Sequence, residues 1–527
     1  MTHVLNIHRG ASAEHAEVVA AMKQPSFYPH HPGAVELRET HTSAVFLAGD
    51  RAYKLKKPVR FPFLDYRSLA TRRRMCAEEL RLNRRLARSV YLAVRSVVRS
   101  RDAYALAAED DPAAVDYVVE MRRFDESVTL ASRVSHHAAG SREIDEVAAR
   151  IASFHAQLEP AAPVRDPRRE VKRTADDNFA SLLELVPAAM EPDVVGAQRF
   201  SDAFLVHRRE MLFERAAGGY VRDGHGDLRA EHILLERPVE IVDCLEFDPS
   251  LRLTDVASDL AFLVMDLHRL GAPALARALV DAYRRHGGNP GDDGLLAFYC
   301  AQRAWVRAKV SMLRAVQLEA AGEDSRDAQI EGRRLLELGR RFAWRARQPL
   351  MLVICGLSGS GKTHLANTLA SVSGFEVLSS DVARKRLAGI EPVRAAAPSH
   401  YTAAFSERTY SELGALAADA LERDGGVIVD ATCRHADERK AFRNTAGEAF
   451  AHARFVECLT PTALRLRRVE ARQPGSTASD ATADIASSQT FDALAELPAG
   501  HHLPLRTDRS VHACAAAVEQ WLDQMPG

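Results

Sequence analysis

The sequence predicts two domains of different fold class, an α+β domain followed by an α/β domain with a doubly wound parallel sheet. At 527 residues the chain exceeds what one hydrophobic core normally serves. Its first part runs from strand-like alternation into long helical stretches, whereas strands and helices alternate regularly after ARQP at 346–349. We therefore expect a lead-in at 1–34, a first domain at 35–345 and a second domain at 346–527.

The composition is that of a globular protein without a dominant charge. Lys and Arg total 70 against 71 for Asp and Glu, so no net charge draws the chain to nucleic acid or acidic membranes. The 7 cysteines are scattered without a C-x-x-C pair, which favours reduced thiols over disulfides or a zinc site. Neither a signal-peptide core nor a run of about 20 apolar residues is evident. We expect a cytoplasmic protein with no membrane partner, and the sequence leaves its oligomeric state open.

The first domain is expected to begin with strands and to end with helices. Alternating apolar residues around a Gly49-Asp50 turn indicate the strands, and helical spacing indicates the rest. The expected segments are strands at 35–59, a helix at 68–87, a strand at 116–124, helices at 141–220, a short strand pair at 232–235 and 239–247, and long helices to 346.

The second domain opens with GLSGSGKT at 356–363, which matches G-x-x-x-x-G-K-[ST] between an apolar strand and a helix. Glycines let backbone N–H groups turn toward phosphate oxygens, and the helix N-terminus adds its positive end. Lys362 is expected to reach the β- and γ-phosphates and Thr363 to ligate Mg²⁺. A chance glycine-rich turn is the competing interpretation, which the flanking strand and helix disfavour. The candidate nucleotide-binding residues here are Gly356, Ser358, Gly359, Ser360, Gly361, Lys362 and Thr363.

Further polar residues follow the strands of this domain. Asp430 ends the apolar segment VIVDAT, where a carboxylate can hold the metal. Asp381 and Arg384 follow the second strand, where the phosphoryl acceptor lies in this topology. Arg468 and Arg472 lie in ALRLRRVEARQ and would stabilise the charge of a transferring phosphoryl group. The competing interpretations are a strand-ending Asp and an exposed basic helix face.

On these motifs, residues 350–527 resemble the P-loop kinases of the zeta-toxin, gluconate-kinase and polynucleotide-kinase-like group. The resemblance covers nearly the whole domain. It implies phosphoryl transfer from ATP, with GTP as an alternative donor. It names no acceptor, because acceptors in this group range from sugars and antibiotics to nucleic-acid ends.

The first domain carries a second phosphotransferase signature, HGDL at 225–228. Asp227 is expected to accept or orient the proton of the acceptor hydroxyl. Asp243 lies sixteen residues later at the end of an apolar strand and is expected to bind Mg²⁺. Glu246 is a weaker candidate for the same metal shell, and Asp259 is expected to support the catalytic loop.

A lysine and a glutamate complete this constellation. Lys54 lies in AYKLKKP, which matches the A-x-K spacing of a kinase lysine strand, and Glu79 in the next helix can pair with it. Lys56 and Glu78 are the alternatives at each position. In this order the residues resemble the aminoglycoside phosphotransferase family over about 35–340. That resemblance implies a protein-kinase-like α+β fold and ATP held by the lysine–glutamate pair.

His232 departs from that family, in which an Asn binds the second Mg²⁺ at this place. Imidazole nitrogen is a poorer ligand than oxygen for this hard cation. Three interpretations remain open: His232 still serves the metal, Glu231 supplies the oxygen instead, or the site is weakened.

The whole chain resembles bacterial proteins described as bifunctional aminoglycoside phosphotransferase/ATP-binding proteins. The expected function is therefore ATP-dependent phosphoryl transfer at two nucleotide sites, to hydroxyls of an unidentified, small-molecule acceptor. One alternative is a P-loop domain that regulates the first kinase. Another is a polynucleotide 5′-end kinase, and nucleic acid is the less favoured partner. A basic patch that could receive RNA, or else a solvated helix face, is formed by Arg72, Arg73, Arg74, Arg81, Arg84 and Arg85.

Overall fold

The chain folds into two compact units in the computed structural model. Residues 13–40, 42–61, 64–100, 103–162, 166–391, 394, 396–471 and 479–525 are described, and the side chain of residue 61 is not. The first unit comprises Met1–Val186 and Arg209–Leu335, and the second comprises Pro187–Arg208 and Leu336–Gly527. The chain therefore passes between the units three times. No sequence feature indicated that 187–208 belongs with the second unit.

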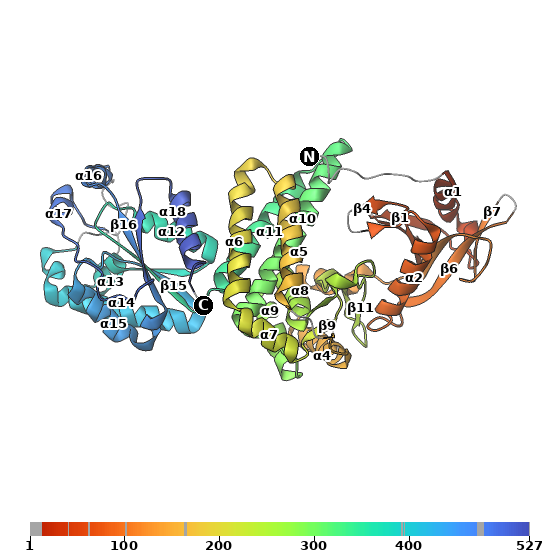
Figure 1. Cartoon of the computed structure of the whole chain (residues 1–527), viewed down its shortest axis with the longest axis horizontal. Helices are drawn as coiled ribbons and strands as arrows, with labels where there is room; N and C mark the ends of the chain where they lie inside the picture. The colour runs from red at the N-terminus through yellow and green to blue at the C-terminus, as the bar shows by residue number, and fades with distance from the viewer. Residues whose placement is uncertain are drawn as a thin grey trace. The chain divides into compact units, whose positions relative to one another are not determined.

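The first unit begins with a six-stranded antiparallel sheet in the order β1-β2-β3-β8-β6-β7 (Figure 1). Val18 and Tyr28 pack with Phe46 and Tyr53 in one buried cluster, and helix α2 contributes Cys76 to a second. The expected lead-in therefore supplies part of this core. The bounds are α1 Ala13–Met22, β1 Val35–Glu39, β2 Ser43–Ala48, β3 Arg51–Lys56, β4 Arg60–Phe61, β5 Leu64–Asp65, α2 Leu69–Asn83, β6 Tyr91–Ser100, β7 Ala103–Ala107 and β8 Ala114–Arg122.

Helices make up the rest of the first unit, and short strands between them carry the loops of the site. Helix α8 is buried at every residue from Val256 to Leu267, which makes it the centre of this part. The helices are α3 Leu130–Ser135, α4 Ser141–Gln157, α5 Arg168–Leu185, α7 Arg209–Ala217, α8 Val256–Arg269, α9 Pro273–Arg285, α10 Asp293–Ala320 and α11 Arg326–Arg345, whose residues from Leu336 belong to the second unit. The strands are β9 Val221–Asp223, β10 Ile233–Leu234, β11 Glu240–Ile241 and β12 Leu253–Asp255. The sheet followed by helices confirms the protein-kinase-like α+β fold.

The second unit contains a five-stranded parallel sheet in the order β14-β15-β13-β16-β17. All six residues of the central strand β13 are buried, as its apolar run predicts. Figure 1 shows α12 and α18 on one face and α13, α14 and α15 on the other, and each face has its own buried cluster. This confirms the doubly wound P-loop fold.

The elements of the second unit have the following bounds: α6 Glu191–His207, β13 Leu350–Cys355, α12 Lys362–Ser373, β14 Glu376–Ser379, α13 Ser380–Leu387, α14 Ala403–Asp424, β15 Gly426–Asp430, α15 Ala436–Ala446, β16 Ala453–Leu459, α16 Thr462–Glu470, α17 Ala483–Ser488, β17 His502–Arg506 and α18 Val511–Leu522. Helix α6 is attached to the end of α18, because Arg199 Nε donates to Asp523 Oδ2 at 2.9 Å.

The basic helix α2 uses much of its charge inside the first unit. Arg72 is buried and its Nε donates to Asp116 Oδ1 at 2.7 Å. Arg84 donates to the carbonyl of Tyr91, and Arg85 donates to that of Gly224 at 2.8 Å. The expected continuous basic patch is therefore reduced to the arginines that remain exposed on this helix.

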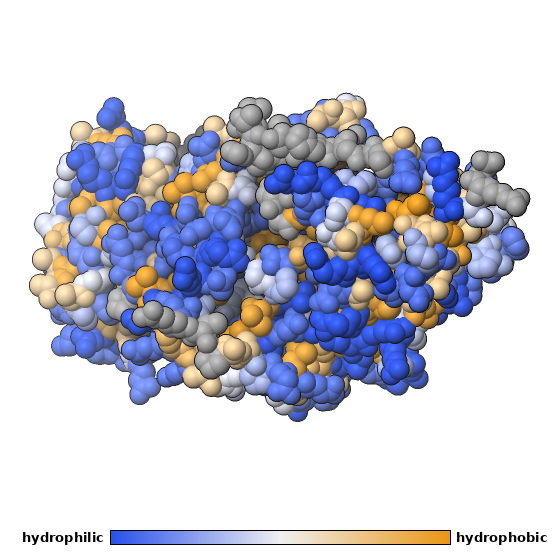
Figure 2. Space-filling model, turned by 45° about the vertical axis from the view of Figure 1, so that its right-hand side comes forward, coloured by the Kyte–Doolittle hydropathy of each residue, from blue (hydrophilic) through white to orange (hydrophobic). Residues whose placement is uncertain are grey.

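No helix among the described residues is both long and apolar enough to cross a bilayer. On the face shown in Figure 2, hydrophilic residues predominate and hydrophobic residues form small separate groups. All seven cysteines are buried free thiols.

Candidate functional site

The expected lysine–glutamate pair forms in the first unit. Lys54 Nζ on β3 donates to Glu79 Oε1 on α2 at 2.8 Å and to Asp243 Oδ1 at 2.9 Å. Burial alone would lower the pKa of Lys54, but the charges of Asp243 and Glu79 outweigh it and hold that pKa well above its usual value. Burial would likewise raise the pKa of Asp243, but Lys54 and His232 hold it well below the usual range. Three predicted residues from distant segments therefore meet at one place.

A second lysine shares the same glutamate. Lys56 Nζ donates to Glu79 Oε2 at 2.7 Å and to Glu246 Oε1, and the hydroxyl of Tyr66 donates to Glu246 Oε1 at 2.7 Å. Lys56 is only 1% exposed. Glu79 therefore bridges both lysines, and they differ in their second partner, which is Asp243 for Lys54 and Glu246 for Lys56. Glu246 binds Lys56 and Tyr66.

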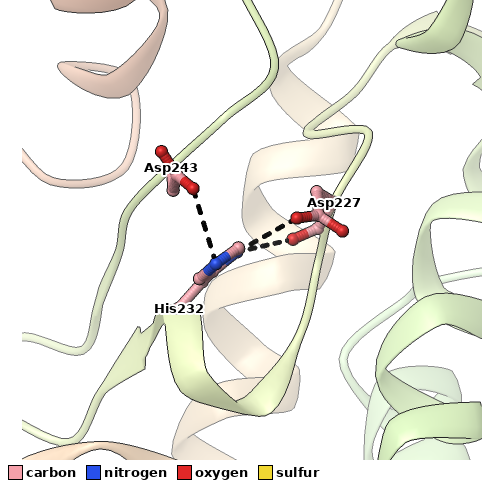
Figure 3. A group of neighbouring side chains, drawn as sticks. All are labelled: Asp227, His232 and Asp243. Carbon is pink, nitrogen blue, oxygen red and sulfur yellow. Dashed lines mark hydrogen bonds and ion pairs between the residues drawn. The ribbon is translucent and has the colours of Figure 1, made fainter. Parts of the chain in front are cut away.

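Asp227, His232 and Asp243 form the candidate metal site (Figure 3). Ligand atoms of these three residues all lie within 4.8 Å of one another. His232 Nδ1 lies 2.9 Å from the carbonyl oxygen of Asp227, and a carbonyl only accepts, so Nδ1 carries the proton. The lone pair is then on Nε2, which lies 3.6 Å from Asp243 Oδ2. A histidine fixed by such a backbone hydrogen bond has the usual arrangement of a metal ligand.

Arg229 is a site residue that the sequence analysis missed. Its Nε lies 3.0 Å from both carboxylate oxygens of Asp227, and its Nη2 lies 3.0 Å from His232 Nε2. Arg229 also contacts Glu231, whose Oε1 lies 3.8 Å from His232 Nε2. A metal ion at His232 Nε2 would have to displace Arg229. The only available signal was its position two residues after Asp227.

Asp259 on α8 holds the catalytic loop from behind. Its carboxylate accepts the backbone N–H groups of His225 at 2.7 Å and Gly226 at 2.9 Å. Gly224 must be glycine, because a Cβ there would lie 2.6 Å from Asp259 Oδ2. Burial would raise the pKa of Asp259, but its hydrogen bond and charge interaction with His155 lower it below the usual range. The Asp259 carboxylate therefore supports the loop of Asp227, as expected.

His225 connects the catalytic loop to the metal-binding loop. Its Nε2 donates to the carbonyl of Val242 at 3.0 Å, and its Nδ1 accepts the backbone N–H of Asp227 at 3.3 Å. The second contact requires a neutral ring, because a protonated Nδ1 cannot accept. Burial lowers the pKa of His225 to about 4, against a smaller opposing effect of Asp259.

The P-loop of the second unit lies between β13 and α12, as predicted. Lys362 Nζ donates to the carbonyl of Leu357 at 3.1 Å, and Thr363 Oγ1 donates to Asp430 Oδ2 at 2.6 Å. The buried Ser360 hydroxyl has no hydrogen-bond partner among the described residues. A free hydroxyl and a redirectable lysine fit phosphate oxygens, and the Thr363–Asp430 pair fits Mg²⁺.

Helix α16 brings arginines to the P-loop, with different contacts. Arg465 is buried and donates to the carbonyl of Ser358 at 3.0 Å, so it braces the loop. Arg468 Nη2 donates to the carbonyl of Thr507 at 2.9 Å, and its Nη1 lies 3.5 Å from where a Cβ on Gly361 would be. Arg472 lies outside the described residues. Arg468 is therefore the predicted arginine that the structure places beside the phosphate loop.

Asp381 and Arg384 both lie on α13. Burial raises the pKa of Asp381, and Lys362 opposes this shift. Arg384 Nη1 donates to the carbonyl of His400 at 2.7 Å, and its guanidinium lies over the ring of Tyr401. Its buried Nε has no partner among the described residues. The two predicted acceptor-side residues therefore lie on one helix, and Arg384 contacts an aromatic ring.

Two further residues of the second unit had no sequence signal. Asp480 accepts from Lys385 Nζ at 2.9 Å and from the Tyr401 hydroxyl at 2.7 Å. Gln489 contacts the phosphate loop, since its Oε1 accepts the N–H of Ser358 at 2.9 Å and its Nε2 donates to the Ser358 hydroxyl. Both lie in the Ser/Thr/Ala-rich stretch at 472–489, which offers no recognisable motif.

Comparisons with known proteins match both units. A family model described as an AAA domain matches residues 351–497. The uncharacterized protein Rv2004c of Mycobacterium tuberculosis is 32% identical over 466 residues, which are 86% of this chain and 89% of that protein.

Two solved structures are also similar. ADP-bound aminoglycoside phosphotransferase APH(2'')-Ib is 14% identical and covers 58% of this chain and 93% of its own, with a TM-score of 0.32. The APS kinase CysC of Mycobacterium tuberculosis, in complex with AMPPNP and APS, is 23% identical and covers 34% of this chain and 99% of its own, with a TM-score of 0.26. The second unit matches the AAA-domain family model, and at 32% identity over 86% of its length the chain belongs to the family of the mycobacterial protein Rv2004c.

Proposed function

We propose that this chain is an ATP-dependent phosphotransferase with two nucleotide sites, one in each unit, which acts in the cytoplasm on hydroxyl groups of small molecules. One observation supports the proposal: each unit brings a candidate phosphate-binding lysine close to a candidate metal-binding carboxylate. In the first unit Lys54 lies 2.9 Å from Asp243, and in the second the residue after Lys362 bonds Asp430. Two such pairs on unrelated folds favour two donor sites over one.

In the first unit, bound ATP with Mg²⁺ supplies the phosphoryl group. Lys54, oriented by Glu79, holds the phosphates, and Asp243 with His232 holds the metal. Asp227 accepts the proton of the acceptor hydroxyl or orients that hydroxyl. Its present partner Arg229 donates to both oxygens of this carboxylate and so fixes its orientation.

In the second unit, Lys362 and the P-loop amides bind the phosphates while Thr363 and Asp430 hold the metal. Asp381 is suited to take the acceptor's proton, because a carboxylate with a raised pKa is a better base near neutral pH. Arg384 and Arg468 would stabilise the charge of the transferring phosphoryl group.

The stoichiometry of nucleotide binding tests this proposal directly. Equilibrium dialysis of the full chain with MgAMPPNP should give two sites per chain. Lys54→Met should remove one of them and Lys362→Ala the other, because each removes the cation that faces the phosphates. A single site in the parent chain, or both sites lost in one variant, would contradict the proposal.

The connectivity favours a second candidate, in which the P-loop unit regulates the first unit. Residues 187–208, which lie between helices of the first unit in the sequence, belong to the second unit. If the P-loop unit regulates the first unit, Lys362→Ala should abolish turnover by the first unit. If the units act independently, the same variant leaves that turnover intact.

A further inference from the structure

A cavity of about 680 Å³ lies in the first unit, in a region that neither proposed reaction uses. It is lined by residues of the β4–β5 hairpin and the segment after it, by the first turns of α2, and by Phe247. Phe247 directly follows Glu246 of the lysine network. The cavity therefore lies against residues that contact the nucleotide site.

The charge of the cavity is predominantly positive. Arg60, Arg67 and Arg74 line it together with a single carboxylate, that of Asp65. Asp65 is occupied by Arg67, whose Nη2 donates to Asp65 Oδ2 at 2.6 Å. The guanidinium groups of Arg60 and Arg74 form no hydrogen bond or ion pair with any residue that the structure describes. Hydrogen bonds with Arg67 lower the pKa of Asp65, and the charge of Arg60 adds a smaller effect. Two guanidinium groups are thus available to an anion.

Other features of the lining suit an anion with an apolar part. Ser68 and Thr71 place hydroxyl groups at the N-terminal turn of α2, whose dipole favours negative charge. Leu64, Met75 and Phe247 supply apolar surface to the same cavity. A phosphate or carboxylate attached to an aromatic or aliphatic group would satisfy both kinds of lining.

The wall of the cavity is held in place from behind. Arg72 is buried and donates to the carbonyls of Tyr66 at 3.1 Å and Arg67 at 3.0 Å while it pairs with Asp116. The backbone N–H of Tyr66 donates to the carbonyl of Val59 at 2.9 Å. A wall fixed in this way loses little freedom when a ligand binds.

Tyr66 connects the cavity to the lysines of the nucleotide site. Tyr66 is a buried residue of the cavity lining, and its hydroxyl donates to Glu246 at 2.7 Å. Glu246 accepts from Lys56, which shares Glu79 with Lys54. A change at Tyr66 therefore reaches Lys54 through a continuous series of hydrogen bonds.

We infer that this cavity is a binding site for an anionic small molecule with an apolar part, and that Tyr66, Glu246 and Lys56 couple its occupancy to nucleotide binding at Lys54. The binding site itself is independent of the proposed function. The coupling rests on that function, since it requires nucleotide at Lys54.

Binding is tested by calorimetry on the full chain carrying Lys362→Ala, which removes phosphate binding at the P-loop. The probes are phenyl phosphate, benzoate and the neutral benzyl alcohol. Phenyl phosphate or benzoate should bind and benzyl alcohol should not, and whichever anion binds identifies the preferred head group. Arg60→Gln with Arg74→Gln should weaken binding about tenfold or more, since each removes a charge-assisted hydrogen bond.

The matched control is Arg81→Gln, an exposed arginine of the same helix outside the cavity. It should change the affinity less than about twofold, as surface charges usually do. Failure of both anions to bind, or equal weakening by Arg81→Gln, overturns the site.

Coupling is tested by the effect of MgAMPPNP on the probe's affinity in the same background. We expect a change of about fivefold or more, with Tyr66→Phe retaining probe binding but abolishing the change. An unchanged affinity, or the same change in Tyr66→Phe, overturns the coupling. Failure of Lys54→Met to reduce MgAMPPNP binding would instead refute the proposed function and leave the binding site standing.

Discussion

Protonation of His225 should destabilise the first unit as the pH falls below neutrality. The ring is fully buried, and its two nitrogens bind the carbonyl of Val242 and the backbone N–H of Asp227. A proton on Nδ1 would replace the acceptor of that N–H with a donor. The same proton would therefore cost stability and displace the backbone of the proposed catalytic aspartate.

The magnitude follows from the pKa of His225, which is lowered from 6.5 to about 4 in the folded chain. The unfolded chain binds the proton first, so stability is complete above pH 6.5 and is lost as the pH falls toward 4. The full loss is about 3 kcal/mol at about 1.4 kcal/mol per pKa unit. At pH 5 it is already about 2 kcal/mol.

The assay is urea unfolding between pH 7.5 and 5, followed by tryptophan fluorescence. Trp344 and Trp521 are replaced by Phe, so that Trp305 on α10 reports the first unit. His225→Asn keeps an acceptor for the N–H of Asp227 but does not titrate. Between pH 7.5 and 5 its free energy of unfolding should therefore fall by about 2 kcal/mol less than that of the parent chain. His136→Asn, at an exposed histidine, should keep the parent's slope. Equal slopes in the parent and His225→Asn would refute the reasoning.

Three further predictions follow from the sites. Lys56→Met should lower the free energy of unfolding of the first unit in urea by about 3 kcal/mol, because it breaks a buried ion pair. Lys54→Met, at a side chain 17% exposed, should cost less stability but should abolish nucleotide binding in this unit. Equal losses of stability would count against the buried network. His232→Asn should reduce the preference for Mn²⁺ over Mg²⁺ about tenfold, because imidazole favours the softer ion; electron paramagnetic resonance of free Mn²⁺ measures it, and an unchanged preference removes His232 from the metal site. Gly359→Ala should destabilise the second unit by about 2 kcal/mol or more in urea unfolding, since φ is +83° and the new Cβ would lie 2.5 Å from a backbone oxygen. Gly389→Ala, with φ +68° but open space around it, should cost less stability. Equal losses of stability would show that backbone strain alone matters.

Much of this architecture could be predicted because short motifs and the order of residues along the chain indicate it. The P-loop motif between a strand and a helix predicted the second fold, and Thr363 and Asp430, each expected near the metal, are in contact. The order of Lys54, Glu79, Asp227 and Asp243 predicted the first. Such motifs are readable because phosphate chemistry demands particular residue types at particular spacings.

Other features depend on contacts between segments far apart in the sequence. Whether Lys54 or Lys56 serves the site could not be decided from a strand on which both point the same way. The structure distinguishes the two lysines by their partners. Both bind Glu79, but Lys54 also binds Asp243, whereas Lys56 binds Glu246, which lies 190 residues away in the sequence. Arg229 resembles any arginine of a loop until its contacts with Asp227 and His232 are visible.

Several elements of the fold also lacked a readable signal. Strands β6 and β7 were not expected, and β17, with the sequence HLPLR, contains a proline that lowers its strand propensity. It is an edge strand of the sheet, where proline is tolerated. The assignment of α6 to the second unit depends on contacts such as that of Arg199 with Asp523, which no local pattern encodes.

We propose that the chain holds two phosphoryl-transfer sites. This proposal is tested most directly by incubating γ-labelled ATP with metabolite and nucleic-acid pools and the parent chain, Asp227→Asn or Lys362→Ala. The account predicts that each variant loses one set of labelled small molecules and keeps the other. Loss of every product in Lys362→Ala alone would show one reaction under control of the P-loop unit. Products unchanged in both variants would contradict the account.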